Sequence, residues 1–349
     1  MVPSPEQYIQ RAIDLSLKGL GHTQTNPLVG CVIVHNNRII GEGYHKQYGG
    51  AHAEVEAIQS VSGKDCTLLK DATLYVTLEP CCHQGKTPPC TELILQHQIP
   101  HVVIAMLDPY PKVSGKGLEM LKQNGVKVDT GVLKERAEFA NRRFICNQEK
   151  HRPYVILKWA ETSNGFMSGS KINQKQISGS MAQTLLHKWR SEESAFMIGK
   201  NTLLQDKPLL NNRLWTGSSP ARIVLGSATQ EFGALDFFSL SLPIFVIGNQ
   251  HKISNLNGAT LVEMDTYELE QILTFILNKG YSSVVVEGGR KLLDSFIQQN
   301  CWDEIRVLKS KKTQFESGIE SPDLPKNFTP LFQDLKEDTL TTIYNSHAV

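Results

Sequence analysis

Two short segments of the sequence contain the residue types that a catalytic metal site needs. The first is His52-Ala53-Glu54, and the second runs from Cys81 to Cys90 after Glu79-Pro80. Zinc prefers tetrahedral nitrogen and sulfur ligands, and a catalytic zinc ion keeps one position for water. The imidazole of His52 and the thiolates of Cys81 and Cys90 would fill three positions. We therefore predict one zinc site per chain, with water in the fourth position.

Glu54 is the residue that could move a proton at such a site. Zinc lowers the pKa of a bound water toward ~7, so that hydroxide is available at neutral pH. A carboxylate that is not a ligand must then carry the proton, and Glu54 follows His52 by two residues, where a helix is expected to begin. Zinc deaminases of nucleobases share a His-x-Glu pattern and a later Pro-Cys-x-x-Cys pattern. Here the first pattern is present, while eight residues separate Cys81 from Cys90.

A structural zinc site, closed by a fourth ligand from Cys82 or His83, is the main alternative. A closed site would have no use for Glu54 and more often contains tight Cys-x-x-Cys pairs, so we prefer the catalytic interpretation. Cys82 is expected to be a packed thiol. For His83, a contact with substrate and a local structural hydrogen bond remain equally open.

The segments around these residues alternate between short β-rich runs and helical patterns, as in βαβ units. The sequence predicts strands over residues 30–34, 39–44, 73–78, 101–107 and 126–130. It predicts helices over residues 6–18, 53–60, 91–98 and 117–124. We therefore expect an α/β domain with a mixed five-stranded sheet covered by helices.

A charged segment marks the boundary to a second domain. A polar helical stretch over residues 133–148 ends in Glu149-Lys150-His151-Arg152-Pro153, and the proline cannot continue a helix. Because the chain of 349 residues is long enough for two domains, we expect them at residues 1–148 and 149–349. The second α/β domain is predicted to have strands over residues 154–160, 195–198, 222–225, 244–247, 284–287 and 304–308, and helices over residues 181–190, 267–277 and 290–298.

The composition narrows the range of partners. The chain has 36 Lys and Arg residues against 35 Asp and Glu, a formal net charge of +1, which argues against a polycationic nucleic-acid binder. No apolar run approaches the ~18 residues that cross a bilayer, and the N-terminus lacks the pattern of a secretory signal, so we expect a cytoplasmic protein without a membrane partner. Seven cysteines, three of them within ten residues, favour metal binding over a disulfide framework.

Five motifs together resemble those of one known family. They are Asn26-Pro27-Leu28-Val29-Gly30-Cys31-Val32-Ile33-Val34, His52-Ala53-Glu54, Thr77-Leu78-Glu79-Pro80-Cys81, Gly85-Lys86-Thr87-Pro88-Pro89-Cys90 and Asp108-Pro109. The chain is similar to the bifunctional deaminase-reductase of riboflavin biosynthesis over nearly all its length, most strongly up to about residue 150. The resemblance implies a cytidine-deaminase-like first domain and a dihydrofolate-reductase-like second domain.

The resemblance also implies two successive reactions on one small molecule. The first domain would hydrolytically remove an amino group from 2,5-diamino-6-(ribosylamino)pyrimidin-4-one 5'-phosphate. The second domain would use NADPH to reduce the ribosyl side chain to ribityl. Zinc and NADPH are therefore the expected cofactors, and a homo-oligomer, either a dimer or a tetramer, is the expected assembly.

Carried over by motif, four residues of the first domain would hold the substrate: Asn26, His45, Lys86 and Asp108. The amide of Asn26 can donate to and accept from a pyrimidine edge, and Lys86 can meet a phosphate. The family commonly has Asp-Pro-Asn-Pro where this chain has Asp108-Pro109-Tyr110-Pro111. Tyr110 therefore stands where the family has an asparagine, and the contact expected from that asparagine is in doubt.

The second domain lacks the Gly-x-Gly-x-x-Gly fingerprint, but Glu287-Gly288-Gly289 leads from a strand into a helix. Backbone N–H groups there could cradle a phosphate, although an ordinary strand-to-helix turn can have the same sequence. By resemblance, the cofactor-binding residues would be Ser178, Thr202, Glu287, Gly288 and Gly289, and the substrate-binding residues Lys158, Arg190, Asp206 and Arg213. Two arginines and a lysine suit a sugar phosphate, while each alone could belong to a solvated charged surface.

Several family segments are altered in this domain. Thr162-Ser163-Asn164-Gly165 replaces Ser-Leu-Asp-Gly, Gln176-Ile177-Ser178 replaces Trp-Ile-Thr, and Lys309-Ser310-Lys311-Lys312 replaces an Ala-Pro-Lys segment. We still expect reductase activity, because the cofactor carries the hydride chemistry. A deaminase with a degenerate C-terminal binding or dimerisation domain is the alternative. The four basic residues of 306–312 could equally guard an exposed edge strand. A third hypothesis, an RNA-editing deaminase, would need a row of cations that the sequence lacks.

Overall fold

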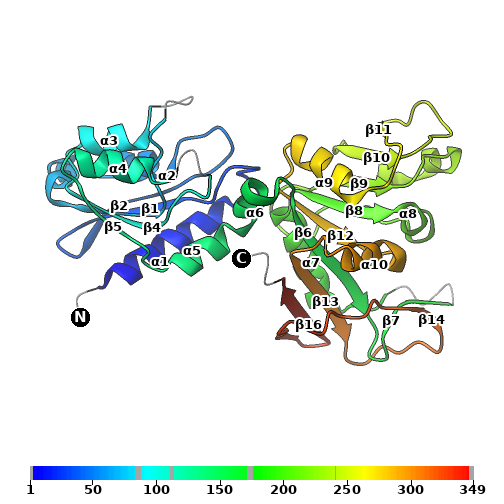
Figure 1. Cartoon of the computed structure of the whole chain (residues 1–349). Helices are drawn as coiled ribbons and strands as arrows, with labels where there is room; N and C mark the ends of the chain where they lie inside the picture. The colour runs from blue at the N-terminus through cyan, green and yellow to red at the C-terminus, as the bar shows by residue number, and fades with distance from the viewer. Residues whose placement is uncertain (1–2, 84–87, 111–113, 171–175, 240, 346–349) are drawn as a thin grey trace. The chain divides into compact units, whose positions relative to one another are not determined.

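The computed structural model describes residues 3–83, 88–110, 114–170, 176–239 and 241–345. The chain forms two compact units, residues 1–151 and 152–349, each with its own sheet (Figure 1). Residue 148, after which the sequence predicts the boundary, lies in helix α6 (Arg142–Lys150), and the units divide just after this helix.

The first unit is built on the predicted mixed five-stranded sheet. Its order is β2-β1-β3-β4-β5, in which β1 runs antiparallel to β2 and β3, whereas β3, β4 and β5 are parallel. The central strands β1, β3 and β4 are nearly continuous apolar runs, as expected for strands covered on both faces. The strands are β1 (Gly30–His35), β2 (Arg38–Tyr44), β3 (Thr73–Leu78), β4 (His101–Met106) and β5 (Lys127–Thr130).

Helices cover both faces of this sheet (Figure 1). Alternate side chains of a strand point to opposite faces. Cys31 and Ile33 of β1 therefore pack with residues of α2, α3 and α4, whereas Val32 and Val34 pack with residues of α1 and α5. The helices are α1 (Pro5–Ser16), α2 (Ala53–Gln59), α3 (Cys90–Gln96), α4 (Lys116–Gln123) and α5 (Lys134–Ala140), with 3-10 turns at Leu17–Gly19 and Gly63–Asp71.

The parallel pair β3 and β4 brings two parts of the candidate site to one edge of the sheet. Leu78 pairs with Met106 at the carboxyl ends of these strands. The chain leaves β3 toward Cys81 and leaves β4 toward Asp108. Because both strands end at the same edge, the metal ligand and the candidate substrate residue start from neighbouring positions.

The single helix expected over residues 133–148 is wrong, because two helices, α5 and α6, meet at Asn141. The side chain of Asn141 is buried and binds the backbone of Leu28, accepting its N–H at 2.8 Å and donating to its carbonyl at 3.0 Å. A side chain that satisfies a distant backbone segment in this way competes with helix continuation.

The second unit contains a nine-stranded sheet of order β11-β10-β9-β8-β12-β6-β13-β16-β15. All neighbouring pairs from β11 to β13 are parallel, and the last two pairs, with β16 and β15, are antiparallel. The strands are β6 (Tyr154–Glu161), β8 (Ala195–Gly199), β9 (Ala221–Leu225), β10 (Ile244–Gly248), β11 (Thr260–Glu263), β12 (Ser283–Glu287), β13 (Glu304–Ser310), β15 (Leu331–Leu335) and β16 (Asp338–Tyr344), with a separate pair of β7 (Phe166–Gly169) and β14 (Gly318–Glu320).

Helices of the second unit pack on this sheet as the α/β prediction requires. Residues of α9 and α10 share one apolar core with alternate side chains of β6 and β12. The helices are α7 (Ser180–Glu192), α8 (Lys200–Asp206), α9 (Leu269–Asn278) and α10 (Arg290–Gln298), with 3-10 turns at Gln230–Ala234 and Asp236–Phe238. The edge-strand role suggested for the basic residues of 306–312 is wrong, because β13 lies between β6 and β16.

Across the described ranges of the chain, every helix is too short or too polar to cross a bilayer.

Candidate active sites

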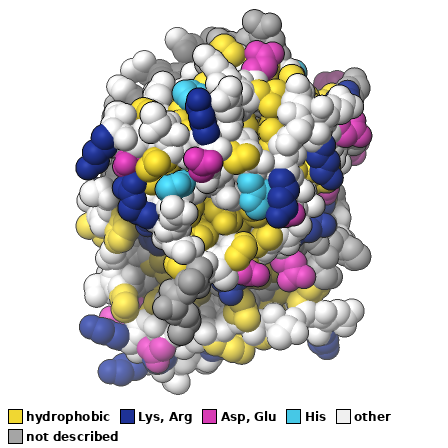
Figure 2. Space-filling model, turned by 90° about the vertical axis from the view of Figure 1, so that its left-hand side faces the viewer, with side chains coloured by type: hydrophobic (Ala, Val, Ile, Leu, Met, Phe, Trp, Pro, Cys, Tyr) yellow, Lys and Arg dark blue, Asp and Glu magenta, His cyan; other side chains and the backbone are white. Residues whose placement is uncertain are grey.

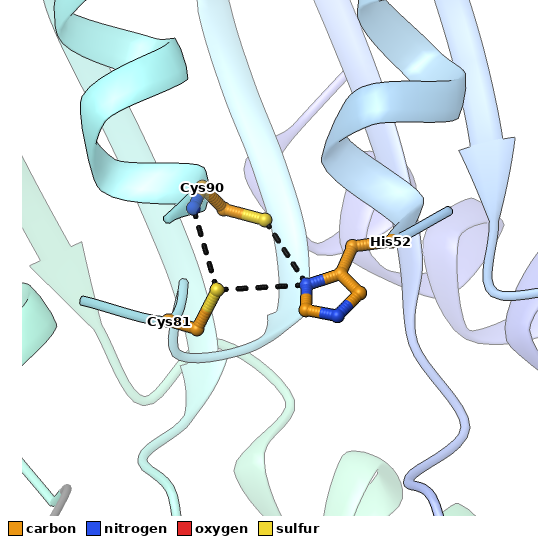
Figure 3. A group of neighbouring side chains, drawn as sticks. All are labelled: His52, Cys81 and Cys90. Atoms are coloured by element: carbon orange, nitrogen blue, oxygen red, sulfur yellow. Dashed lines mark hydrogen bonds between the residues drawn. The ribbon is translucent and has the colours of Figure 1, made fainter. Parts of the chain in front are cut away.

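Three predicted metal ligands meet in the first unit, as Figure 3 shows. His52 is the residue before α2, Cys81 follows β3, and Cys90 begins α3. The Nδ1 atom of His52 lies 3.3 Å from Sγ of Cys90 and 3.5 Å from Sγ of Cys81. The three ligand atoms all lie within 4.8 Å of one another.

These separations fit a zinc ion. Tetrahedral zinc, with bonds of about 2.3 Å to sulfur and about 2.1 Å to nitrogen, holds such ligand atoms roughly 3.6 Å apart. In the described part of the chain, no fourth His, Cys, Asp or Glu joins the group. A structural site closed by Cys82 or His83 is therefore not supported, and a water position remains.

The two cysteines share a proton in a way that favours metal binding, because one of them is readily present as a thiolate. A hydrogen bond from the Cys90 thiol, together with His52, lowers the pKa of Cys81 well below its usual range. The backbone N–H of Cys90 also donates to Sγ of Cys81, at 3.3 Å. The shared proton and burial raise the pKa of Cys90. Since zinc binds thiolates, an ion at this position would displace the shared proton.

Glu54 lies in the first turn of α2 and is 3 % exposed. Its Oε2 atom is buried and has no hydrogen-bond partner among the residues that the structure describes. Burial raises the pKa of Glu54 to about 7, with a further contribution from the charge of Cys81. A buried carboxyl with a free oxygen and a pKa near neutrality is suited to accept and return a proton.

Asn26 and His45 form a hydrogen-bonded pair next to the metal ligands. The rings of His45 and His52 meet edge to face at 5.9 Å. Nδ1 of His45 lies 2.9 Å from the carbonyl of Ala51, which only a protonated nitrogen can satisfy. Burial lowers the pKa of His45, so the ring is neutral and Nε2 accepts from the Asn26 amide at 3.1 Å. The amide orientation is thereby set, and the Asn26 carbonyl oxygen is left for a ligand.

Asp108 lies just after β4. One carboxylate oxygen accepts the N–H of Tyr110 at 2.8 Å. Burial raises the pKa of Asp108, and the charges of Glu79, His83 and Cys81 also act on it. Asp108 is therefore close to the metal group. Lys86, the fourth predicted substrate residue, lies outside the described residues.

A cavity of about 940 Å³ in the second unit gathers most of the residues predicted there. Its volume suits a cofactor with part of a substrate. Of the residues that differ from the family pattern, Gln176 lines the cavity. Asn164 instead donates to the carbonyl of Phe315 and supports a turn. The predicted residues in its wall are Lys158, Ser178, Thr202, Asp206, Glu287, Gly288 and Gly289.

The turn Gly288-Gly289 has a backbone conformation that favours glycine. Both residues have a positive φ, 78° and 80°, which side chains disfavour. A Cβ at Gly289 would lie 3.1 Å from Oγ1 of Thr202, in the wall of the cavity. The glycines therefore leave room in which a cofactor can approach the backbone.

Lys158, Glu287 and Arg190 form a buried ion cluster at the cavity. Nζ of Lys158 lies 2.8 Å from Oε1 of Glu287, and the Arg190 guanidinium lies 3.6 Å from Oε2. Burial alone would raise the pKa of Glu287, but the two cations lower it to about 2. Glu287, which we predicted to bind cofactor, thus also holds two predicted substrate residues.

His187 lies between Arg190 and Arg213 and was not among the residues predicted from the sequence. Burial and the charges of both arginines lower the pKa of His187 to about 4. Its neutral ring accepts the backbone N–H of Arg213 at 3.0 Å. Neither arginine lines the cavity: Arg190 reaches Glu287 in its wall, whereas the Arg213 guanidinium donates to the side chain of Asn211. The signal in the sequence was the spacing of three residues between His187 and Arg190, which places both on one face of a helix.

Two family models match the two units. Residues 3–106 match the cytidine and deoxycytidylate deaminase zinc-binding region, and residues 153–310 match the RibD C-terminal domain. These matches place the metal group in a zinc-binding domain and the cavity in a reductase domain.

Curated relatives and solved structures agree with this assignment. The riboflavin biosynthesis protein RibD of Aquifex aeolicus is 36% identical over 91% of this chain and 90% of the relative. That of Bacillus amyloliquefaciens is 37% identical over 86% of this chain and 82% of the relative. The crystal structure of a diaminohydroxyphosphoribosylaminopyrimidine deaminase/5-amino-6-(5-phosphoribosylamino)uracil reductase from Thermotoga maritima is 34% identical, with a TM-score of 0.90 over 97% of this chain and 98% of that chain.

Proposed function

The chain belongs to the family of the riboflavin biosynthesis protein RibD, and from this premise we propose which residues carry its two reactions. The protein is a bifunctional enzyme, a zinc-dependent pyrimidine deaminase fused to an NADPH-dependent reductase. The proposed substrate is 2,5-diamino-6-(ribosylamino)pyrimidin-4-one 5'-phosphate, which is first deaminated and then reduced from the ribosyl to the ribityl form. We assign the deaminase to residues 1–148 and the reductase to residues 149–349.

In the deaminase, His52, Cys81 and Cys90 would hold the zinc ion. The ion would supply an activated water at neutral pH. Through its buried Oε2, Glu54 would take one proton from the attacking water and pass it to the amino group. The hydroxyl would form the new bond to the ring carbon as the carbon–nitrogen bond breaks and ammonia leaves. The buried position of Glu54 supports this role, because it excludes bulk water from the proton path.

Asn26, His45, Lys86 and Asp108 are proposed to hold the pyrimidine and its phosphate. The neutral His45 fixes the amide of Asn26, so that its carbonyl accepts from an N–H of the substrate ring. Asp108, which interacts electrostatically with Cys81, would bind the pyrimidine, and Lys86 would meet the phosphate.

In the reductase, Ser178, Thr202, Glu287, Gly288 and Gly289 are proposed to bind NADPH. The cofactor supplies the hydride. Lys158, Arg190, Asp206 and Arg213 are proposed to hold the ribosyl phosphate, supported by the contact of Lys158 and Arg190 with one carboxylate, that of Glu287. A degenerate second domain is not favoured, because Lys158 and Glu287, predicted to bind substrate and cofactor, both line a large cavity and pair there.

The assembly, the cellular location and the absence of further partners are also proposed. We propose a homo-oligomer in the cytoplasm that binds neither membranes nor nucleic acid. The net charge of +1 supports the last point. On the face drawn in Figure 2, the Lys and Arg side chains among the described residues are dispersed between acidic and apolar ones.

The meeting of His52, Cys81 and Cys90 beside the buried Glu54 carries the proposal, and Glu54→Gln tests it. The variant should keep its zinc, lose ammonia release by about a thousand-fold or more, and still oxidise NADPH with preformed deaminated intermediate. The matched control is Glu56→Gln, which removes a charge from the same helix at a surface pair with Lys46. Ammonia release at the wild-type rate in Glu54→Gln would refute the proton-transfer role.

A further inference from the structure

Glu79 is a buried residue to which neither reaction assigns a role. It lies between the end of β3 and the metal ligand Cys81, and it is 5 % exposed. Its two carboxylate oxygens accept four backbone N–H groups. Oε2 accepts from Asp108 at 3.2 Å and Gly115 at 2.9 Å, and Oε1 accepts from Gly117 at 2.8 Å and Leu118 at 3.2 Å.

The four donors belong to two different segments of the chain. Gly117 and Leu118 are in the first turn of α4, where backbone N–H groups lack partners within the helix. Asp108 follows β4. In the described residues Glu79 has no salt bridge with a cation, so its side chain is held by backbone groups. One carboxylate thus ties the start of α4 to the residue that follows β4.

The backbone of Glu79 is itself held firmly. Its N–H donates to the carbonyl of Met106 at 3.0 Å, which continues the pairing of β3 with β4. The next residue, Pro80, packs against Gly117 so closely that a Cβ on Gly117 would lie 2.2 Å from the Pro80 carbonyl oxygen. The segment before Cys81 is therefore enclosed between β4 and α4, and Glu79 provides its polar contacts.

We propose that Glu79 is a positioning residue for deamination, which fixes Asp108 relative to Cys81 and so sets where the pyrimidine lies against the metal group. Glu79 does not contact the substrate but acts through Asp108. This inference rests on the proposed function, in which Asp108 holds the substrate.

A carboxylate is required at this position because all four partners are donors. Glutamine has the same shape but presents an NH₂ group to two of the four N–H groups, whichever way its amide is turned. Aspartate keeps both acceptor oxygens on a side chain that is one methylene shorter. It should therefore restore part of the contact.

The experiment compares Glu79→Gln and Glu79→Asp with Glu119→Gln, which removes an exposed charge from the first turn of the same helix. Four quantities are measured on the full chain: amide hydrogen exchange, zinc content, KM and kcat for ammonia release, and NADPH oxidation with deaminated intermediate. The last measurement reports whether the second unit remains intact.

In Glu79→Gln, the amides of Asp108, Gly115, Gly117 and Leu118 should exchange about ten-fold faster or more. KM for deamination should rise about ten-fold while kcat changes less than about three-fold and zinc is retained. Glu79→Asp should recover part of the KM, and Glu119→Gln should match the wild type. In an Asp108→Ala background, Glu79→Gln should raise KM little further, because it acts through that residue.

Unchanged exchange at the four amides would overturn the proposal, and so would a fall in activity that follows loss of zinc. A loss confined to kcat would also overturn it. If the wild-type chain releases no ammonia, the proposed function fails instead, and the exchange pattern still decides whether Glu79 holds the two segments. Should Glu79→Gln not fold, Glu79→Asp gives the same readouts.

Discussion

Lys158 and Glu287 face each other on adjacent parallel strands, with 2.8 Å between Nζ and Oε1 at the wall of the large cavity. Their side chains are 7% and 17% exposed, and Arg190 approaches the same carboxylate from α7. The wall of the cavity therefore contains part of an ion cluster. The cluster can orient Lys158 toward a sugar phosphate while Glu287 balances its charge.

Removing this carboxylate should destabilise the second unit. Glu287→Gln leaves Lys158 buried without its partner, and we expect a loss of about 3 kcal/mol in the free energy of unfolding at pH 7. Against the effect of burial, two cations lower the pKa of Glu287 from 4.5 to about 2, so this contribution is present above pH 4.5 and is lost as the pH falls toward 2. Urea unfolding at pH 7 and pH 3 checks both points. An equal stability difference at the two pH values would contradict this assignment.

The hydrogen bond from Asn26 to His45 leads to a prediction on pH dependence. In Asn26→Asp, the carboxylate faces the unprotonated Nε2 of His45, and both groups are acceptors. As the pH falls, His45 gains a proton and can donate to the new carboxylate. KM for deamination, relative to the wild type, should therefore rise about ten-fold at pH 8 and less at pH 6. Asn37→Asp, in an exposed turn, is the control, and a ratio independent of pH would contradict the predicted tautomer.

Metal removal should separate the two activities. A chelator should abolish ammonia release but leave NADPH oxidation with deaminated intermediate, and added zinc should restore the first activity. Cys81→Ser should lose zinc, whereas Cys82→Ser should keep it, because Cys82 is not in the ligand group. Metal analysis and both assays on the same samples provide the test. Loss of zinc in Cys82→Ser would show that the ion has a fourth protein ligand.

The turn after β12 should be sensitive to a single methyl group. In Gly289→Ala, the Cβ would lie 3.1 Å from Thr202 Oγ1, and we expect KM for NADPH to rise about ten-fold. Gly280→Ala is a matched control, because Gly280 also has a positive φ, of 88°, but a Cβ added there would meet no atom within 4 Å. Both variants should lose about 1 kcal/mol of stability. Equal KM values in the two variants would exclude a role for the turn in cofactor binding.

The metal group and the first sheet could be predicted because their signals are local. His52, Cys81 and Cys90 offer the nitrogen and sulfur ligand atoms that zinc prefers, and the carboxylate of Glu54 follows His52 by two residues. Strands such as β1 and β4 are apolar runs that need burial on both faces. In each case the residue type alone carries most of the information.

Other features depend on partners that are far away in the chain. The break between α5 and α6 follows from a bond between Asn141 and Leu28, 113 residues apart. Glu79 belongs to the motif that ends in Cys81. Its partners are backbone N–H groups, which every residue except proline has, so the sequence does not reveal them. The strand β15 was missed because its side chains are largely exposed and Phe332 is 69% accessible, so it lacks the buried pattern of a predictable strand.

The most direct test measures ammonia and NADPH in one reaction with purified, zinc-analysed protein and the phosphoribosylated diaminopyrimidinone. Without NADPH, the protein should bind one zinc ion per chain and release one ammonia per substrate. When NADPH is added, one equivalent should be oxidised for each deaminated molecule. Ammonia release from zinc-free protein, or no NADPH oxidation after complete deamination, would contradict the account of a zinc deaminase fused to an active reductase.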